Sequence, residues 1–228
     1  MGNNILVVAA HPDDEILGCG ASIAQHISGG DRVCVLILGE GVAARRQLTE
    51  EQKEIGISAV LQAARAASNF LGVENLEIRQ FPDNSFDSVP LLDIVSEVEE
   101  EIRFFHPEVI YTHNYSDVNI DHRLVAEAVE AATRPMEGSS IRRVLSFEIP
   151  SSTEWNFIKG EFFRPNVFLN VTKYFEKKIT ALEFYQHEMR DFPHPRSYEY
   201  IRSLARVRGG QAGFLYAEAF QLVYEKIV

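Results

Sequence analysis

The sequence predicts an α/β fold in which helices cover both faces of a mainly parallel central sheet. The first observation is a pair of nearly continuous apolar runs, one beginning at Ile5 and one over residues 32–38, as in strands buried on both faces. The second is the helical pattern over residues 18–28 that joins them, because two strands joined by a helix form a parallel βαβ unit. The third is the gathering of polar residues directly after the strands, where parallel sheets carry their ligand-binding loops.

The remaining elements continue this alternation along the chain. Further strands are predicted over residues 76–81, 108–113, 144–149 and 166–171. Helices are predicted up to about residue 69, over 91–105, around the apolar positions from 124 to 132, over 173–187 and over 197–208. The closing segment, 217–224, fits a helix or a strand. Together these elements predict a single domain over residues 1–228, a Rossmann-like three-layer sandwich.

The composition indicates an ordinary globular protein and excludes some partners. Acidic residues outnumber basic ones by 33 to 22, which argues against nucleic acid as the main partner because phosphate binding needs clustered Lys and Arg. No apolar run approaches the ~20 residues that span a bilayer, and no leader-like segment precedes Ile5, so we expect a cytoplasmic protein without a membrane span. Cys19 and Cys34 lack a metal-binding spacing and are expected to be buried free thiols.

The end of the first strand carries a dense group of polar residues, His11-Pro12-Asp13-Asp14-Glu15. An imidazole and a carboxylate three residues apart can bind a divalent metal such as zinc, which leaves the other aspartate free to act as a base. These ligands suit zinc without excluding iron, manganese or cobalt. The alternative is that the three acids only complement the positive end of the following helix dipole.

A second informative stretch, residues 114–123, follows the fourth strand. His122 falls in the first turn of the helix that begins there, so it lies at the same edge of the sheet as His11. The positive helix terminus disfavours imidazolium, and we therefore expect His122 to be a neutral metal ligand. Two histidines and one carboxylate with an open position are typical of a catalytic metal site. His113, at the strand end, either orients a neighbour or is a satisfied, semi-buried histidine.

Three weaker candidates lie in other loops. Arg45 follows the second strand and could bind a phosphate or carboxylate through its guanidinium fork, although a solvated position at a helix start explains it equally well. Asp83 could hydrogen-bond a ligand hydroxyl or simply form a turn. His194 stands between two prolines, which suits either a residue held beside a site or an exposed turn.

The two motifs together resemble a known family. A strand followed by Ala-His-Pro-Asp-Asp-Glu, paired with Asn-x-Asp-His-Arg at the fourth strand-to-helix junction, is similar to the PIG-L/LmbE-like zinc-dependent N-deacetylases. The Ala-Glu-Ala-Phe ending at residues 217–220 is also similar to that family. The resemblance implies that His11, Asp14 and His122 bind Zn²⁺, or another divalent metal such as Fe²⁺, and that Asp13 is the general base.

One position departs from the family pattern. Many members carry a histidine three residues before the last ligand, where it helps to stabilise the oxyanion, and this chain has Asn119 there. An amide can donate a hydrogen bond to a developing oxyanion, but it cannot give a proton to the leaving amine. That proton is then expected from Asp13 or from His194. Asp121, whose position is also acidic in the family, is expected to orient its neighbours by hydrogen bonds.

The resemblance implies a hydrolase that removes the acetyl group from an N-acetylated amino sugar, of the N-acetylglucosamine type, or from its conjugate. Arg45 and Asp83 are the candidate substrate-binding residues. The same residues would also suit an O-acetyl ester, a non-sugar amide or an inactive sugar-binding relative. A nucleotide-binding protein is disfavoured because the first strand is not followed by Gly-x-Gly-x-x-Gly. A homo-oligomer is a further expectation, from the resemblance and from the aromatic segment near Trp155.

Overall fold

The computed structural model describes residues 2–41, 49–157, 160 and 162–227. Their strands form one seven-stranded sheet with the order β3-β2-β1-β4-β5-β7-β6. Neighbouring strands from β3 through β5 pair in parallel, whereas β7 is antiparallel to both β5 and β6. The strands are β1 (Asn4–Ala9), β2 (Arg32–Gly39), β3 (Asn75–Phe81), β4 (Val109–His113), β5 (Arg143–Phe147), β6 (Val167–Asn170) and β7 (Ala217–Glu225).

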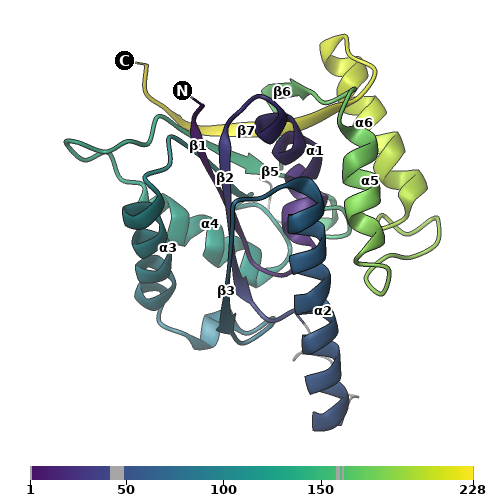
Figure 1. The fold of residues 1–228 in the computed structure, drawn as a ribbon, viewed down its shortest axis with the longest axis horizontal. Coiled ribbons are helices and arrows are strands. Elements are labelled where there is room, and N and C mark those ends of the chain that lie inside the picture. The colour runs from purple at the N-terminus through teal and green to yellow at the C-terminus, as the bar shows by residue number, and fades with distance from the viewer. Residues whose placement is uncertain (1, 42–48, 158–159, 161, 228) are drawn as a thin grey trace.

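Helices cover both faces of this sheet, which makes the three-layer sandwich that the sequence predicts (Figure 1). One face is covered by α1 (Asp14–Ser28), α2 (Glu50–Leu71), α5 (Phe175–Glu183) and α6 (Tyr198–Ala212). The other is covered by α3 (Leu91–Phe105) and α4 (Ile120–Ala132). Two short 3₁₀ helices, η1 (Phe86–Ser88) and η2 (Thr153–Trp155), lie in loops.

Strand β1 lies at the centre of the molecule, between β2 and β4. Its residues alternate between two cores, with Ile5 facing one and Leu6 the other, and both are fully buried. This double burial explains why the strand is a continuous apolar run rather than an alternating one. Because β2 and β4 lie on opposite sides of β1, the connections diverge there, and ligands bind at such a point beyond the carboxyl ends of the strands.

Helix α1 differs from its prediction in a way that affects the functional site. It begins at Asp14, not at residue 18, because Asp13 occupies the N-cap and places the acids in the first turn. Cys19 then has non-helical backbone angles, which kink the helix. Glu218 of β7 accepts hydrogen bonds from the backbone N–H groups of Ala21 and Ser22 just after this kink. The acidic motif therefore belongs to the helix terminus rather than to a loop.

Two further segments differ from the sequence expectation. Helix α5 ends at Glu183 rather than at residue 187. The closing segment, 217–224, which fitted either element, is the antiparallel strand β7.

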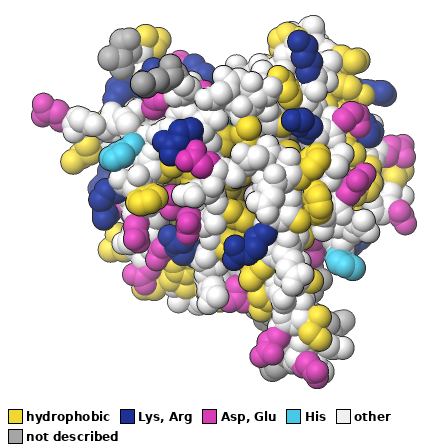
Figure 2. Space-filling view, in the orientation of Figure 1, with side chains coloured by type: hydrophobic (Ala, Val, Ile, Leu, Met, Phe, Trp, Pro, Cys, Tyr) yellow, Lys and Arg dark blue, Asp and Glu magenta, His cyan; other side chains and the backbone are white. Residues whose placement is uncertain are grey.

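Several surface and compositional expectations can be compared with the structure. Cys19 and Cys34 are buried and free, as predicted. No helix among the described residues is long and apolar enough to cross a membrane. On the face drawn in Figure 2, basic side chains lie among acidic and apolar ones rather than in a continuous patch. The single-domain organisation, the cytoplasmic location and the homo-oligomer stay predictions.

Candidate active site

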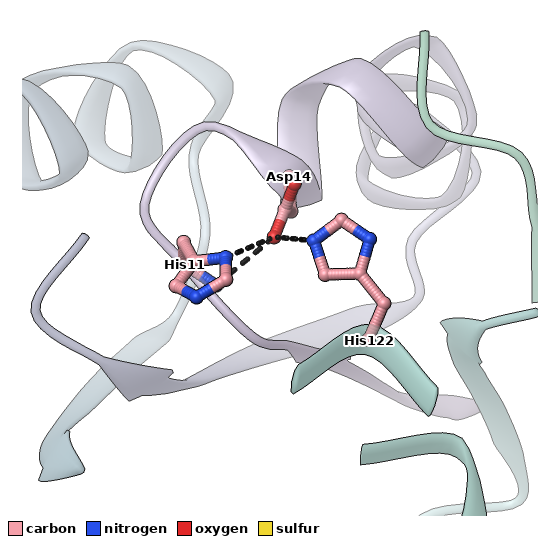
Figure 3. Close-up of side chains that lie close together, drawn as sticks. All are labelled: His11, Asp14 and His122. Carbon is pink, nitrogen blue, oxygen red and sulfur yellow. Dashed lines mark hydrogen bonds and ion pairs between the residues drawn. The ribbon is translucent and has the colours of Figure 1, made fainter. Parts of the chain in front are cut away.

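The structure brings the ends of β1 and the start of α4 together around one carboxylate. Asp14 lies between the imidazoles of His11 and His122 (Figure 3). Asp14 Oδ2 is 3.4 Å from His11 Nδ1 and 3.2 Å from His122 Nε2. All three side chains are buried, and their candidate ligand atoms lie within 4.8 Å of one another. The three residues predicted to bind the metal therefore meet in space.

This group fits a divalent metal ion on three observations. Asp14 Oδ1 is buried and has no hydrogen-bond partner, which is costly for a carboxylate oxygen unless a ligand reaches it. The far nitrogens of both rings are held by other carboxylates, so the near nitrogens face Asp14: His11 Nε2 is 2.9 Å from Asp121 Oδ2, and His122 Nδ1 is 3.2 Å from Asp117 Oδ2. Two imidazoles and one carboxylate match catalytic zinc and also suit iron.

Nearby carboxylates act on the charge of His122 in addition to the helix terminus. Burial lowers the pKa of this imidazole, but the charges of Asp14 and Asp117 outweigh it and raise the pKa to about 9. Burial likewise lowers the pKa of His11, but its hydrogen bonds to Asp121 and Asp14 outweigh this effect and raise the pKa to about 10. The two carboxylates therefore act on the pKa of His122 in the direction opposite to the helix terminus, and the neutral His122 of a metal site stays a prediction. Metal binding at this group would release protons.

Asp121 and Asp83 approach His11 from the side opposite Asp14. Asp121 accepts the backbone N–H of Phe86 through Oδ1 and contacts His11 through Oδ2, so it ties the imidazole to the η1 loop. This is the arrangement expected of an orienting residue. Asp83 Oδ1 lies 3.3 Å from His11 Nε2, and it also accepts a hydrogen bond from Asn84. Asp83 is therefore at the site, while its role in substrate binding stays a prediction.

Asp117 orients His122 in the same way, and the sequence analysis did not identify it. Its carboxylate accepts hydrogen bonds from the hydroxyls of Ser152 and Thr153, the second at 2.6 Å, and from the backbone N–H of Asn119 at 2.8 Å. These contacts join the start of α4 to the η2 loop. The available signal was an aspartate five residues before the ligand His122.

His113 packs directly beneath the ligand group. Its ring stacks on that of His122 with centroids 4.0 Å apart, and its Nε2 accepts the backbone N–H of Ala10 at 2.8 Å. Burial holds the pKa of His113 well below its usual value. Of the two alternatives left open by the sequence, the contacts favour a neutral histidine that orients its neighbour.

Asp13, next to the ligand Asp14 in the chain, has an unusual backbone conformation. Its φ is 108°, in the left-handed region that residues other than glycine rarely adopt. Its carboxylate accepts a hydrogen bond from Arg196 Nη1 at 2.6 Å. Burial raises the pKa of Asp13 well above the usual value, and the charge of Arg196 opposes this rise. Asp13 is thus a second buried carboxylate beside the metal-binding group, paired with a cation.

One polar pocket connects these groups. It has a volume of about 370 Å³. The described residues that line it are His11, Asp13, Gly41, Asp83, Asn84, Asn119, His122, Ser151, Ser152, Glu188 and Arg196. Both ligand histidines, Asp13 and Asn119 therefore open on the same space.

The remaining predicted site residues, Asn119, His194 and Arg45, differ in where the structure places them. Asn119 caps α4, where its side-chain oxygen accepts the N–H of Asp121 at 2.8 Å, and its amide nitrogen donates to Asn84 at 3.0 Å. His194 is not among the described residues that line the pocket. Its Nδ1 accepts the backbone N–H of Arg196, and its ring packs against Trp155. Arg45 lies outside the described residues. The catalytic roles of Asn119 and His194 and the binding role of Arg45 stay predictions.

Besides Gly41 and Asn84, which lie in the loops after β2 and β3, four lining residues were not predicted to be in the site. Arg196 and Glu188 approach from the segment after α5, and Ser151 and Ser152 from the η2 loop. Arg196 belongs to the same polar cluster as His194, so a signal existed for it. No pattern in the sequence distinguishes Glu188 or the two serines from other surface residues.

The comparison with protein families decides the relationship. The family model described as "PIG-L: GlcNAc-PI de-N-acetylase" matches residues 6–133, more than half of the chain. The chain belongs to the PIG-L family. The matched part of this PIG-L protein contains His11, Asp13, Asp14 and His122, so the resemblance seen in the sequence is confirmed.

Individual relatives differ in activity. This PIG-L protein is 29% identical to the uncharacterized deacetylase YaiS of Escherichia coli K12, over 78% of this chain and 88% of YaiS. It is 23% identical to the diacetylchitobiose deacetylase of Thermococcus kodakarensis, over 96% of this chain and 82% of that protein. The crystal structure of GalB, the 4-carboxy-2-hydroxymuconate hydratase of Pseudomonas putida KT2440, is 25% identical, with a TM-score of 0.78 over 99% of this chain and 98% of GalB. Relatives therefore include deacetylases and a hydratase.

Proposed function

We propose that this protein is a metal-dependent deacetylase that removes the acetyl group from an N-acetylated amino sugar or its conjugate. The observation that carries the proposal is the opening of His11, His122 and Asp13 on one polar pocket. A three-residue ligand group beside a separate buried carboxylate supplies the two parts that amide hydrolysis needs. The deacetylases among the relatives support the same reaction.

The residues of the chain divide the chemistry between them. A zinc ion held by His11, Asp14 and His122 would polarise the amide carbonyl and lower the pKa of a water molecule towards ~7. Asp13 accepts the proton of the attacking water. Arg196, bonded to Asp13, holds the carboxylate in place and favours its ionised form.

Two later steps use Asn119 and, again, Asp13. Asn119 lines the pocket and donates a hydrogen bond towards the oxyanion. The leaving amine receives its proton from Asp13, with His194 as the alternative donor. Asp13 is the better placed of the two because it lines the pocket and His194 is not among its described lining residues.

The described part of the pocket lining favours an uncharged, hydroxyl-rich substrate. Apart from the metal-binding group, the described lining residues include three acids, Asp13, Asp83 and Glu188, and one cation, Arg196, which is already paired with Asp13. Carboxylate and amide groups accept and donate hydrogen bonds to sugar hydroxyls, whereas acidic walls repel phosphate and carboxylate groups. A neutral N-acetylated sugar fits this lining.

The GalB relative makes hydration of a carbon–carbon double bond the second candidate function. The same metal and base could add water to such a bond. GalB, however, is named for a substrate that carries carboxylates. The acidic lining described above disfavours a substrate of that charge.

The test is acetate release from a panel of N-acetylated amino sugars, supplied free, phosphorylated and nucleotide-linked, with zinc-loaded and iron-loaded protein. We expect release that chelation abolishes and zinc restores, fastest for a neutral sugar. The parallel assay follows loss of the ultraviolet absorbance of a carboxylated diene. Absorbance loss without acetate release, in protein with bound metal, would replace the deacetylase with the hydratase.

A further inference from the structure

Asp13 has a strained backbone that its surroundings must hold in place. The residue combines a φ of 108° with a ψ of −29°, and a side chain other than glycine in such a conformation persists only when neighbouring groups fix it. Its carbonyl oxygen accepts the backbone N–H groups of Ile16 and Leu17 in the first turn of α1. The N–H and the carboxylate of Asp13 therefore need partners from elsewhere.

The N–H of Asp13 is held by Glu15. The Glu15 side chain turns back from the first turn of α1, and its Oε2 accepts the Asp13 N–H at 3.0 Å. Glu15 is fully buried. A buried carboxylate with one bound oxygen would be poorly satisfied, so the state of its second oxygen matters.

Tyr185 binds that second oxygen. Its hydroxyl donates to Glu15 Oε1 at 2.6 Å. Tyr185 follows α5 and is itself buried in the core on that face of the sheet. Burial and the neighbouring Glu15 raise the pKa of the phenol well above its usual value, so it remains a donor. The hydrogen bonds thus run from Tyr185 through Glu15 to the backbone of Asp13.

The side chain of Asp13 is held from the same part of the chain. Arg196, which bonds its carboxylate, also donates through Nε to Ser151 at 3.0 Å and lies 3.7 Å from Glu188. The segment 185–196 therefore fixes Asp13 at both ends, the backbone through Glu15 and the carboxylate through Arg196.

We propose that Glu15 and Tyr185 are positioning residues that fix the backbone of Asp13 and so aim its carboxylate into the pocket. The effect on turnover rests on the proposed function, in which Asp13 is the base. A simpler role for Glu15 is to cap α1, but a cap requires one acceptor oxygen. The buried bond from Tyr185 orients the whole carboxylate, and a cap alone does not require it.

The decisive variant is Tyr185→Phe, which removes one hydroxyl and keeps the ring. The matched control is Tyr111→Phe, because Tyr111 is also buried and its hydroxyl bonds His26 Nε2 at 2.9 Å, away from Asp13. Hydrogen exchange of the Asp13 amide, followed by NMR on ¹⁵N-labelled protein, reports the geometry without any substrate. We expect exchange about tenfold faster in Tyr185→Phe and unchanged in the control. Unchanged exchange in Tyr185→Phe would overturn the proposal.

A second pair of variants separates the acceptor from the charge. Glu15→Gln keeps an acceptor oxygen for the Asp13 amide and is expected to keep its exchange within about twofold of the parent protein. Glu15→Ala removes the acceptor and is expected to speed exchange as Tyr185→Phe does, or more. Slow exchange in the alanine variant would contradict the proposal.

Turnover then tests the consequence. We expect Tyr185→Phe to lower kcat about tenfold with KM and bound metal unchanged, and to cause no further loss when Asp13 is already asparagine. An equal loss in both backgrounds would mean that Tyr185 acts independently of Asp13. If no N-acetylated sugar releases acetate, the proposed function fails, while amide exchange still decides whether Glu15 and Tyr185 hold Asp13.

Discussion

Residues 6–133, which the family model matches, supply the metal-binding group and Asp13, whereas the part beyond residue 133 supplies Tyr185 and Arg196, which hold Asp13 from outside the matched residues. In the first part, His11, Asp14 and His122 lie at the ends of adjacent parallel strands or in the helices that follow. In the second part, Tyr185 and Arg196 reach the same site from a loop segment after α5.

This difference indicates that the first part carries the reacting groups, whereas the second part adjusts how well Asp13 works. The strand ends of the first part fix the ligands in a rigid sheet, as active sites in α/β proteins require. Loops tolerate more change than strands, and the second part is where family members with different substrates can differ. Substitutions of the metal-binding residues or Asp13 in the first part should therefore remove most of the turnover, and those in the second part should tune it.

The largest expected effect is the loss of the metal-binding group. His122→Ala should lower metal affinity and reduce turnover by about 10³-fold or more, because one of three ligands and its charge balance are lost. Bound metal is measured by atomic emission and turnover by acetate release. The exposed His187→Ala is the control and should match the parent protein. Full metal occupancy with full turnover in His122→Ala would exclude His122 as a ligand.

Asp13→Asn should separate the base from the metal. Asparagine also tolerates the left-handed backbone of this position, so the fold and the metal group should persist. Removal of a general base typically lowers kcat by about 10²–10⁴-fold. Metal content and turnover are measured on the same sample. Turnover close to the parent value would show that Asp13 is not the base. The first part would then contribute only the metal ligands to the reaction.

Arg196→Gln tests the second part. Burial raises the pKa of Asp13 and Arg196 opposes this, so removing the guanidinium should raise the pKa further. The base is then ionised only at higher pH, and the acidic limb of the kcat/KM profile should move to higher pH, with turnover at pH 7 about 10–100-fold lower. The control is Arg190→Gln in the same loop, where the guanidinium bonds backbone carbonyls of His187 and Met189. If the pH profiles of the parent protein and both variants coincided, Arg196 would not influence the pKa of Asp13, and only residues of the first part would set it.

Much of the first part could be predicted from the sequence because its signals are local. Strand β1 is a continuous apolar run since both of its faces are buried, and the polar residues that follow must lie at the strand end. His11 and Asp14 are three residues apart, and His122 is fixed by the first turn of α4. The start of α1 was misplaced because the acids that form its first turn also fitted a loop.

The second part gave little signal because its contacts depend on packing between distant segments. His194 and Arg196 stand in one polar loop, and local pattern does not determine which of them faces the pocket. Folding places Arg196 against Asp13 and His194 against Trp155. The bond between Tyr185 and Glu15 likewise joins residues far apart in the chain, and a tyrosine inside the helix predicted over residues 173–187 gives no hint of it.

The smallest expected effect concerns Asn119, where the first part departs from the family pattern. Serine retains the N-cap of α4 but lacks the amide donor. The free energy of unfolding of Asn119→Ser should therefore lie within about 0.5 kcal/mol of that of the parent protein. Its kcat should fall about tenfold, less than for a typical oxyanion donor, because the amide also bonds Asn84.

Asn119→Ala completes this test, because it loses both the donor and the cap. It should show the same kcat as the serine variant and be less stable by about 1 kcal/mol in urea unfolding. Parent-level kcat in Asn119→Ser would assign Asn119 to the helix cap alone. Stabilisation of the oxyanion would then have to come from another lining residue, and the described lining donors include Asn84 in the first part and Ser151, Ser152 and Arg196 in the second. If one of the latter three stabilised the oxyanion, the second part would take part in the reaction itself and would not only tune it.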